Sequence, residues 1–155
     1  MAFLKAADVV EMAMELEKSG EAFYRAVAQK AKSPQVQSLF QDLAGQEVRH
    51  YKTFAKLSKA VRDKPWMLAG EWEEYQGYLE ATVQSAFFEG EDKALAVAEE
   101  VADEKEAVRM AMGFEKETLL FFHDLRDMVS GADREVIERI VAEEKSHVRR
   151  LAGML

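Results

Sequence analysis

The sequence carries EVRH at residues 47–50 and EKSH at residues 144–147, two Glu-x-x-His motifs that begin 97 residues apart. Both motifs lie in long stretches whose apolar residues recur with the spacing of a helix. Because residues three apart lie on the same face of a helix, the Glu and the His of each motif can point at the same place. Two copies of one motif on two predicted helices favour a bundle made of two similar halves.

Each motif is preceded by a predicted helix that carries one central glutamate. The segment AMELEK at residues 13–18 resembles AMGFEK at residues 111–116, which makes Glu17 and Glu115 equivalent. The offset here is 98 residues, against 97 for the motifs, so one residue is lost in a turn. Each half therefore consists of a helix with one Glu, a short turn and a helix with Glu-x-x-His.

Helical spacing extends over four long stretches: 6–32, 34–61, 103–129 and 133 to near the C-terminus. Ser33 and Pro34 predict the start of the second helix, because Ser is a preferred N-cap and Pro is favoured at the first helical position. Ser130 and Gly131 end the third helix, and Asp133 is expected to cap the fourth. The sequence thus predicts an all-α protein.

A long connection over residues 62–102 separates the two halves. A structureless loop of this length would be unusual, so we expect part of it, residues 71–88, to be helical. The short turns within each half predict antiparallel helix hairpins over residues 6–61 and 103–153. The long connection can run the length of a bundle. We therefore expect one domain over residues 1–155, a four-helix bundle with the connectivity of ferritin-like proteins.

Polar residues interrupt the apolar stripes on the faces that should point into the bundle. Burying four ionised carboxylates together is costly, because each loses hydration and repels the others. No lysine or arginine lies in the stripes at this level, so two divalent cations are the simplest neutralising partners. Carboxylate and imidazole ligands suit iron or manganese well, and zinc less distinctively. The predicted metal ligands are Glu17, Glu47, His50, Glu115, Glu144 and His147.

The alternative for either motif alone is a metal-free core histidine. The repeat favours the metal site, because two of only three histidines occupy equivalent places in it. His123 lies off the stripe, and we expect it at the surface or behind the ligands. Tyr24 and Phe122 follow the central glutamates at equivalent places. Packing is the expected role of Tyr24, and the alternatives are a hydrogen bond to the site or a radical on its ring.

The composition excludes several classes of protein. The chain has 29 acidic and 21 basic residues and a formal net charge of −8, which disfavours nucleic-acid and anionic-membrane partners. The absence of cysteine rules out a disulfide framework, a Cys-ligated zinc site and an iron–sulfur cluster. Lys5, Asp8 and Glu11 interrupt the first apolar residues, so we predict no signal peptide or membrane helix and a cytoplasmic location.

The sequence resembles the rubrerythrin-like branch of the ferritin-like superfamily. The segments that carry the resemblance are MELEKSGEAFY at 14–24, FQDLAGQEVRHYKTF at 40–54, MGFEKETLLFF at 112–122 and IVAEEKSHVRRL at 140–151. The resemblance implies a centre of two iron ions, for which manganese or zinc can substitute. The roles that it implies are Glu17 and His50 as ligands of one ion, Glu115 and His147 as ligands of the other, and Glu47 and Glu144 as bridges.

The resemblance also implies a non-haem di-iron oxidoreductase that reduces hydrogen peroxide or oxidises ferrous iron with O₂. Full rubrerythrins add a rubredoxin-type iron site with four cysteines, which this sequence lacks, so electrons are expected from a separate donor protein. Thr118 stands where rubrerythrins proper carry an additional carboxylate. Two other functions stay open: metal binding or iron buffering without turnover, and oxygenation of an organic substrate, for which the sequence shows no identifiable pocket.

Aromatic residues are concentrated in the long connection. Trp66, Trp72, Tyr75 and Tyr78 can either form a dimer surface or cover the bundle. Many relatives dimerise, so a homodimer is the expected assembly. The sequence ends at Leu155, a few residues after the fourth predicted helix, and a 24-subunit ferritin shell is therefore not expected.

Overall fold

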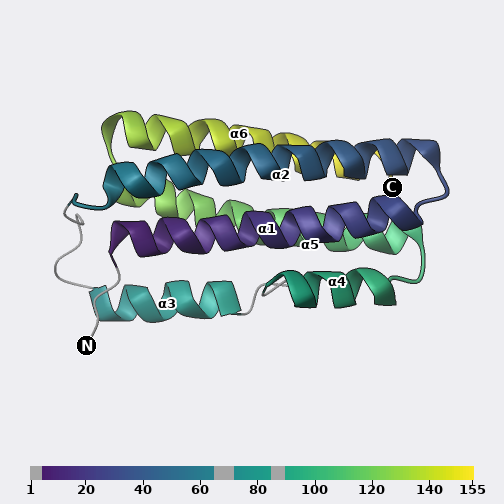
Figure 1. Ribbon diagram of the computed structural model, residues 1–155, viewed down its shortest axis with the longest axis horizontal. Coiled ribbons are helices and arrows are strands. Elements are labelled where there is room, and N and C mark those ends of the chain that lie inside the picture. Colours follow the sequence, from purple (N-terminus) through teal and green to yellow (C-terminus); the bar gives the residue numbers. More distant parts are fainter. Residues whose placement is uncertain (1–4, 65–71, 85–89) are drawn as a thin grey trace.

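A computed structural model describes residues 5–64, 72–84 and 90–155 of the chain. These residues form helices and no strands. The prediction of an all-α bundle with ferritin-like connectivity is confirmed (Figure 1). The helices are α1 (Ala6–Lys30), α2 (Pro34–Val61), α3 (Trp72–Gln84), α4 (Glu91–Glu100), α5 (Glu104–Met128) and α6 (Gly131–Ala152).

Two antiparallel hairpins form the body of the molecule. One consists of α1 and α2, and the other of α5 and α6 (Figure 1). The end of α2 and the start of α5 lie at opposite ends of the bundle, so the chain between them has to travel its full length. α3 and α4 make this crossing end to end along one edge, where α4 packs mainly against α1 and α3 contacts α5.

Caps and turns fix where the hairpins begin. The Ser33 hydroxyl accepts a hydrogen bond from the Val36 backbone N–H, and Pro34 opens α2, as predicted. The carboxylate of Glu104, at the start of α5, accepts hydrogen bonds from the backbone N–H groups of Lys32 and Ser33 at 2.6 and 2.9 Å. Glu104 thereby connects the loop between α1 and α2 to the N-terminal end of α5.

The prediction for the start of the last helix is wrong. α6 begins at Gly131, whose φ of +59° lies in the left-handed region that glycine tolerates best. Asp133 therefore lies within the first turn of α6 and does not cap it. Its carboxylate instead forms an ion pair with Lys64, just beyond the end of α2.

The connection contains more helix than the sequence predicted. α3 ends at Gln84, and residues 85–89 lie outside the described residues. α4 was not predicted; it follows Gly90, whose φ is +88°, and has Glu91 and Asp92 in its first turn, where acidic side chains favour the helix dipole. The Lys30 ammonium donates hydrogen bonds to two backbone carbonyls near the C-terminal end of α4, of Ala98 at 2.9 Å and Glu99 at 3.1 Å.

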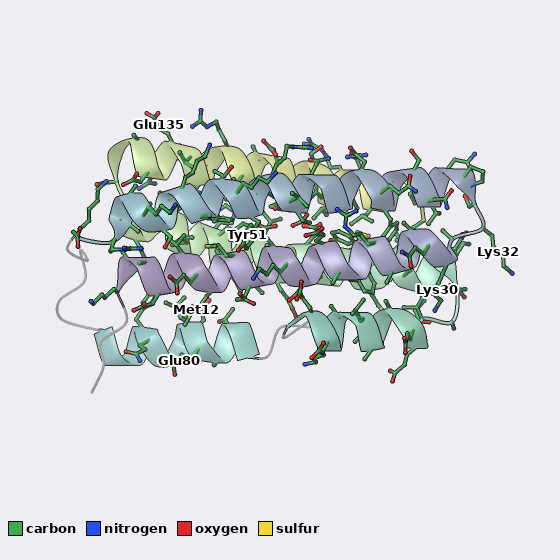
Figure 2. All side chains as sticks on the ribbon, viewed as in Figure 1. Met12, Lys30, Lys32, Tyr51, Glu80 and Glu135 are labelled. Atoms are coloured by element: carbon green, nitrogen blue, oxygen red, sulfur yellow. The ribbon has the colours of Figure 1, made fainter. Side chains whose placement is uncertain are left out.

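Aromatic residues pack on both sides of the middle of the bundle. The rings of Tyr24 and Phe40 lie 5.6 Å apart between α1 and α2, and those of Phe54 and Phe122 lie 4.9 Å apart between α2 and α5. All four side chains are fully buried. Side chains fill the space between the four long helices, whereas Lys32 and Glu135 point outward (Figure 2). Buried aromatic pairs thus lie before and after the middle of α2.

No helix within residues 5–64, 72–84 and 90–155 combines the length and the apolar character needed to cross a membrane. The tyrosines of the connection cover the bundle: the Tyr78 hydroxyl donates a hydrogen bond to Asp124 of α5, and Tyr75 packs against the core. Trp66 lies outside the described residues, and Trp72 opens α3.

Gly20 allows close packing in the middle of α1. A Cβ atom at this position would lie 2.8 Å from Cε1 of Phe114 and 3.5 Å from Cγ of Glu47. The first distance is shorter than a van der Waals contact permits. The missing side chain therefore lets the Phe114 ring lie directly against α1.

We predict that Gly20→Ala lowers the free energy of unfolding by about 1 kcal/mol, because overpacking against buried Phe114 outweighs the gain in helix propensity. Urea denaturation measures the change. Gly77→Ala in the middle of α3 is the matched control, since a Cβ there meets nothing within 4 Å. The control should raise the free energy of unfolding by about 0.5–1 kcal/mol. Equal stabilisation by both substitutions would contradict the close contact at Gly20.

Candidate metal centre

The structure brings all six predicted ligands into one cluster in the middle of the bundle. Each is almost completely buried, with at most 2 % of its surface exposed. One glutamate comes from α1, one from α5, and a Glu-x-x-His pair from each of α2 and α6. The residues are Glu17, Glu47, His50, Glu115, Glu144 and His147.

These residues form two groups of four that share two members. In each group, one ligand atom from each residue lies within 4.8 Å of the others, close enough to hold one metal ion. Glu47 and Glu144 belong to both groups, which is the arrangement that bridging carboxylates require. The first group is Glu17, Glu47, His50 and Glu144, and the second is Glu47, Glu115, Glu144 and His147.

Glu144 lies between the two imidazole rings. One of its oxygens is 2.8 Å from Nδ1 of His50, and the other is 2.8 Å from Nδ1 of His147. The two rings stack with their centroids 5.7 Å apart. His147 Nδ1 also lies 3.3 Å from a carboxylate oxygen of Glu115. The Nδ1 atoms of both histidines therefore face the carboxylates.

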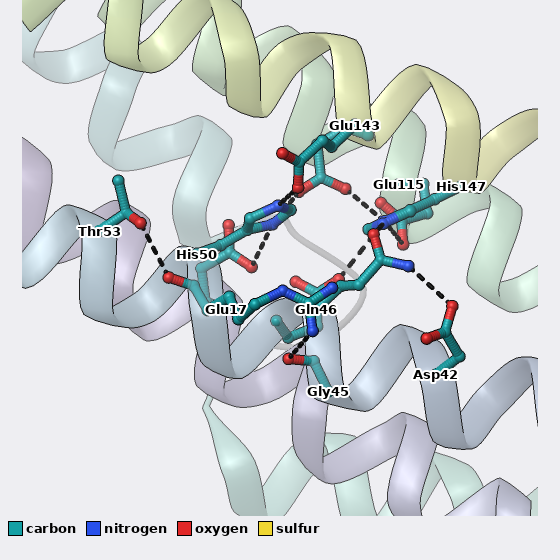
Figure 3. Close-up of polar contacts among 12 residues, drawn as sticks. Glu17, Asp42, Gly45, Gln46, His50, Thr53, Glu115, Glu143 and His147 are labelled. Carbon is teal, nitrogen blue, oxygen red and sulfur yellow. Dashed lines mark hydrogen bonds and ion pairs between the residues drawn. The ribbon is translucent and has the colours of Figure 1, made fainter.

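The outer nitrogen of each histidine has a partner on the opposite helix (Figure 3). His50 Nε2 lies 2.7 Å from Oε2 of Glu143, and His147 Nε2 lies 2.8 Å from Oε1 of Gln46. The sequence analysis missed both partners. Their position in the sequence could have indicated them, since Gln46 and Glu143 each directly precede a shared glutamate.

The chemistry of the cluster fits a metal centre. Glu17 Oε1, Glu17 Oε2 and Glu115 Oε2 are buried without a hydrogen-bond partner among the described residues. Buried polar groups are normally satisfied, so each such oxygen needs an explanation. None of the buried residues in the described part of the chain is a lysine or arginine. Oxygen and imidazole nitrogen donors without a cationic side chain suit iron or manganese.

Burial and mutual repulsion disfavour the charged forms of three of these carboxyl groups. Burial raises the pKa of Glu115 to about 8, and the charge of Glu144 adds to this. Burial also raises the pKa values of Glu17 and Glu47 well above their usual range, and the charges of Glu144 and Glu115 act in the same direction. The contact between Glu17 and Glu47 lowers the pKa of Glu17 and raises that of Glu47. Without metal, these groups therefore keep their protons to a higher pH than an ordinary carboxyl group does.

Glu144 behaves in the opposite way because two histidines contact it. Burial acts to raise its pKa, but hydrogen bonds from His147 and His50 lower the pKa of Glu144 below its ordinary value. Burial acts to lower the pKa values of both histidines. Their carboxylate partners outweigh it and raise the pKa of His50 to about 9 and that of His147 to about 10. Protons thus partly neutralise the metal-free cluster.

Tyr24 packs in the core and also contacts the cluster. Its hydroxyl donates a hydrogen bond to Oε1 of Glu115. Burial and the charge of Glu115 raise the pKa of Tyr24 well above its usual value, so the phenol stays protonated. Phe122, at the equivalent place in the second half, has no hydroxyl. The Tyr24 hydroxyl therefore contacts the group of four that contains Glu115 and His147, and the other group has no equivalent phenol.

Thr118 and His123 lie on α5 outside both groups of four. Thr118 is 2 % exposed, and its hydroxyl has no hydrogen-bond partner among the described residues. His123 belongs to neither group of four and is partly exposed on α5, as expected from its position off the stripe.

We predict that the metal-free protein loses stability as the pH rises from 6 to 9. Glu17, Glu47, Glu115 and both histidines have raised pKa values, so in this range the folded chain binds more protons than the unfolded chain. Each extra proton lowers the free energy of unfolding by about 1.4 kcal/mol per pH unit. Glu144 contributes no slope here, because its lowered pKa affects stability only near and below pH 4.5.

Urea denaturation of the chelator-treated protein at several pH values measures this slope. Glu115→Gln is the comparison variant, since it removes one titrating carboxyl group and should make the slope shallower. A free energy of unfolding that is constant or rises over this range would contradict the prediction.

Comparisons with known proteins agree with the cluster and the fold. None of the curated proteins matches this chain. A crystal structure from Thermotoga maritima, described as a ferritin-like diiron-carboxylate protein, aligns with a TM-score of 0.73 and 25% sequence identity. The alignment covers 99% of this chain and 96% of that chain. The family model named Rubrerythrin matches residues 8–155. The chain therefore belongs to the rubrerythrin family.

Proposed function

We propose that this chain is a di-iron oxidoreductase that reduces hydrogen peroxide or oxidises ferrous iron with O₂. The observation that supports it best is the pair of four-residue groups that share Glu47 and Glu144 in a fully buried site. Membership in the rubrerythrin family supports the same activity. A centre of this kind would protect the cell from oxidants or process iron.

The six residues would hold two metal ions. Glu17 and His50 would bind one ion, Glu115 and His147 the other, and the two shared glutamates would bridge them. Four carboxylates carry four negative charges, and two divalent ions carry four positive charges. The ions would thereby replace the protons that neutralise the metal-free cluster.

Two ferrous ions at this site would supply the two electrons that convert one hydrogen peroxide and two protons into two water molecules. The protein's own contribution is to position the ligands and exclude water. Tyr24 holds the Glu115 carboxylate by a hydrogen bond. Along α2, the aromatic pair at Phe40 lies two turns before Glu47, and the pair at Phe54 lies one turn after His50. Such hydrophobic surroundings control solvent access and the reduction potential of a metal centre.

A separate protein would supply the electrons for further turnovers, since the chain has no cysteine for a rubredoxin-type site. A homodimer is the assembly that we propose. Sedimentation equilibrium would test it, and a mass of one chain at micromolar concentration would exclude it.

Metal buffering without turnover is the second candidate function. Thr118 favours it, because this buried hydroxyl stands where rubrerythrins proper carry an additional carboxylate, and a hydroxyl does not replace that group. Reversible metal release with no oxidant-dependent chemistry would support buffering over the oxidoreductase.

We predict two iron ions per chain after anaerobic loading, measured by elemental analysis. Glu47→Ala combined with Glu144→Ala should reduce this to near zero, because each shared carboxylate contributes to both positions. Glu11→Ala combined with Glu135→Ala is the control: it removes the same charge from exposed positions on α1 and α6 and should leave the content unchanged. Equal iron content in all three proteins would place the metal elsewhere.

We also predict that the iron-loaded protein oxidises rapidly when mixed with stoichiometric hydrogen peroxide or O₂ in a stopped-flow spectrometer. Comparing the two oxidants separates peroxide reduction from ferrous oxidation by O₂. Ferrous iron mixed with the Glu47→Ala, Glu144→Ala variant gives the background rate. Oxidation no faster than this background, with both oxidants, would refute the oxidoreductase and leave buffering.

A further inference from the structure

The two halves of the cluster have outer partners in the same place but of different charge. The residue directly before each shared glutamate contacts the histidine of the other hairpin. On α6 this residue is Glu143, a carboxylate, and on α2 it is Gln46, a neutral amide. The repeat thus preserves the position of the hydrogen bond and changes its chemistry.

The orientation of the Gln46 amide is fixed by its own neighbours. Its nitrogen donates a hydrogen bond to Oδ2 of Asp42 at 2.9 Å, and Asp42 forms an ion pair with Arg150 at 2.7 Å. The amide oxygen is therefore left to accept from Nε2 of His147. Glu143 likewise offers only acceptors to His50. In both halves Nε2 carries the hydrogen, which leaves Nδ1 as the atom that can bind a metal.

A carboxylate partner makes an imidazole a stronger metal ligand than an amide partner does. Glu143 forms no ion pair with a lysine or arginine among the described residues, and its half-exposed carboxylate lies 2.7 Å from Nε2 of His50. On the other side, Gln46 is hydrogen-bonded to the carboxylate of Asp42, which forms an ion pair with Arg150. The position that contains His50 therefore lies in the more negative surroundings.

Glu17 and Glu115, the two glutamates that belong to one group each, also have different contacts, and the difference favours the same metal position. Tyr24 donates a hydrogen bond to Glu115 and so withdraws electron density from this carboxylate. No hydroxyl donates a hydrogen bond to Glu17 in the part of the chain that the structure describes, and its printed contacts are with the cluster residues Glu47 and His50. The equivalent of Tyr24 in the second half is Phe122, which cannot donate a hydrogen bond. Two independent contacts thus favour the position of Glu17 and His50.

We propose that Glu143, Gln46 and Tyr24 are positioning residues that make the two metal positions unequal. The position of Glu17 and His50 binds a divalent ion first and more tightly, and the position of Glu115 and His147 binds the second ion more weakly. This inference rests on the proposed function, since it requires that the six residues bind metal.

Titration of the metal-free protein with Co²⁺ tests the proposal. Calorimetry gives the number of steps and their affinities, and NMR spectra of ¹⁵N-histidine-labelled protein show which imidazole responds at each step. We expect two steps in the wild-type protein, with His50 responding first. Glu143→Gln keeps a hydrogen-bond acceptor but removes the charge, and should lower the affinity of the first step about tenfold.

The most direct test exchanges the two histidine partners, Gln46 and Glu143. Gln46→Glu combined with Glu143→Gln keeps the net charge and moves the carboxylate to the other histidine, so it should move the first step toward His147. Tyr24→Phe should strengthen the second step alone. Glu135→Gln is the charge control, because it removes one exposed carboxylate from the far end of α6 and should leave both steps unchanged (Figure 2).

The outcomes separate this inference from the function on which it rests. Two equal steps, a first step at His147, or identical titrations for Glu143→Gln and Glu135→Gln would overturn the inequality while leaving the metal centre intact. A wild-type protein that binds no Co²⁺ would overturn both.

Discussion

The rest of the structure depends on the burial of four carboxyl groups in the middle of a helical bundle. Ionised carboxylates in such a place lose hydration and repel one another, and none of the described buried residues is a lysine or arginine that could compensate. Protons held by raised pKa values relieve part of this cost in the metal-free chain. Two divalent ions would relieve it more fully. The same constraint thus links the stability of the bundle to the chemistry that we propose for it.

The two hairpins meet at this cluster and are joined there by polar contacts as well as by apolar packing. Glu144 contacts both histidines, and the outer nitrogen of each histidine reaches across to the opposite helix. The two halves are similar in where these contacts lie and different in their charge. A repeat that keeps positions but varies partners can produce two unequal metal positions from one architecture.

The sequence predicted the hairpins and the cluster well because both follow from helical periodicity. Polar residues that interrupt an apolar stripe must either be exposed or have a function in the interior. The recurrence of the same polar residues in both halves indicated a function in the interior. Periodicity gave less information about α4, a short helix without a long apolar stripe. It also misplaced the start of α6, because the left-handed backbone of Gly131 let the helix begin before Asp133.

By itself, the sequence determined which residues face the interior, since a period of 3.6 residues assigns each position to a face. It also determined that the two halves are equivalent. Only the tertiary structure decided which partners those residues meet. Gln46 and Glu143 look like ordinary polar residues of a helix, and they contact histidines about 100 positions away in the chain. Such contacts depend on how the hairpins are rotated and aligned against each other, which local spacing does not specify.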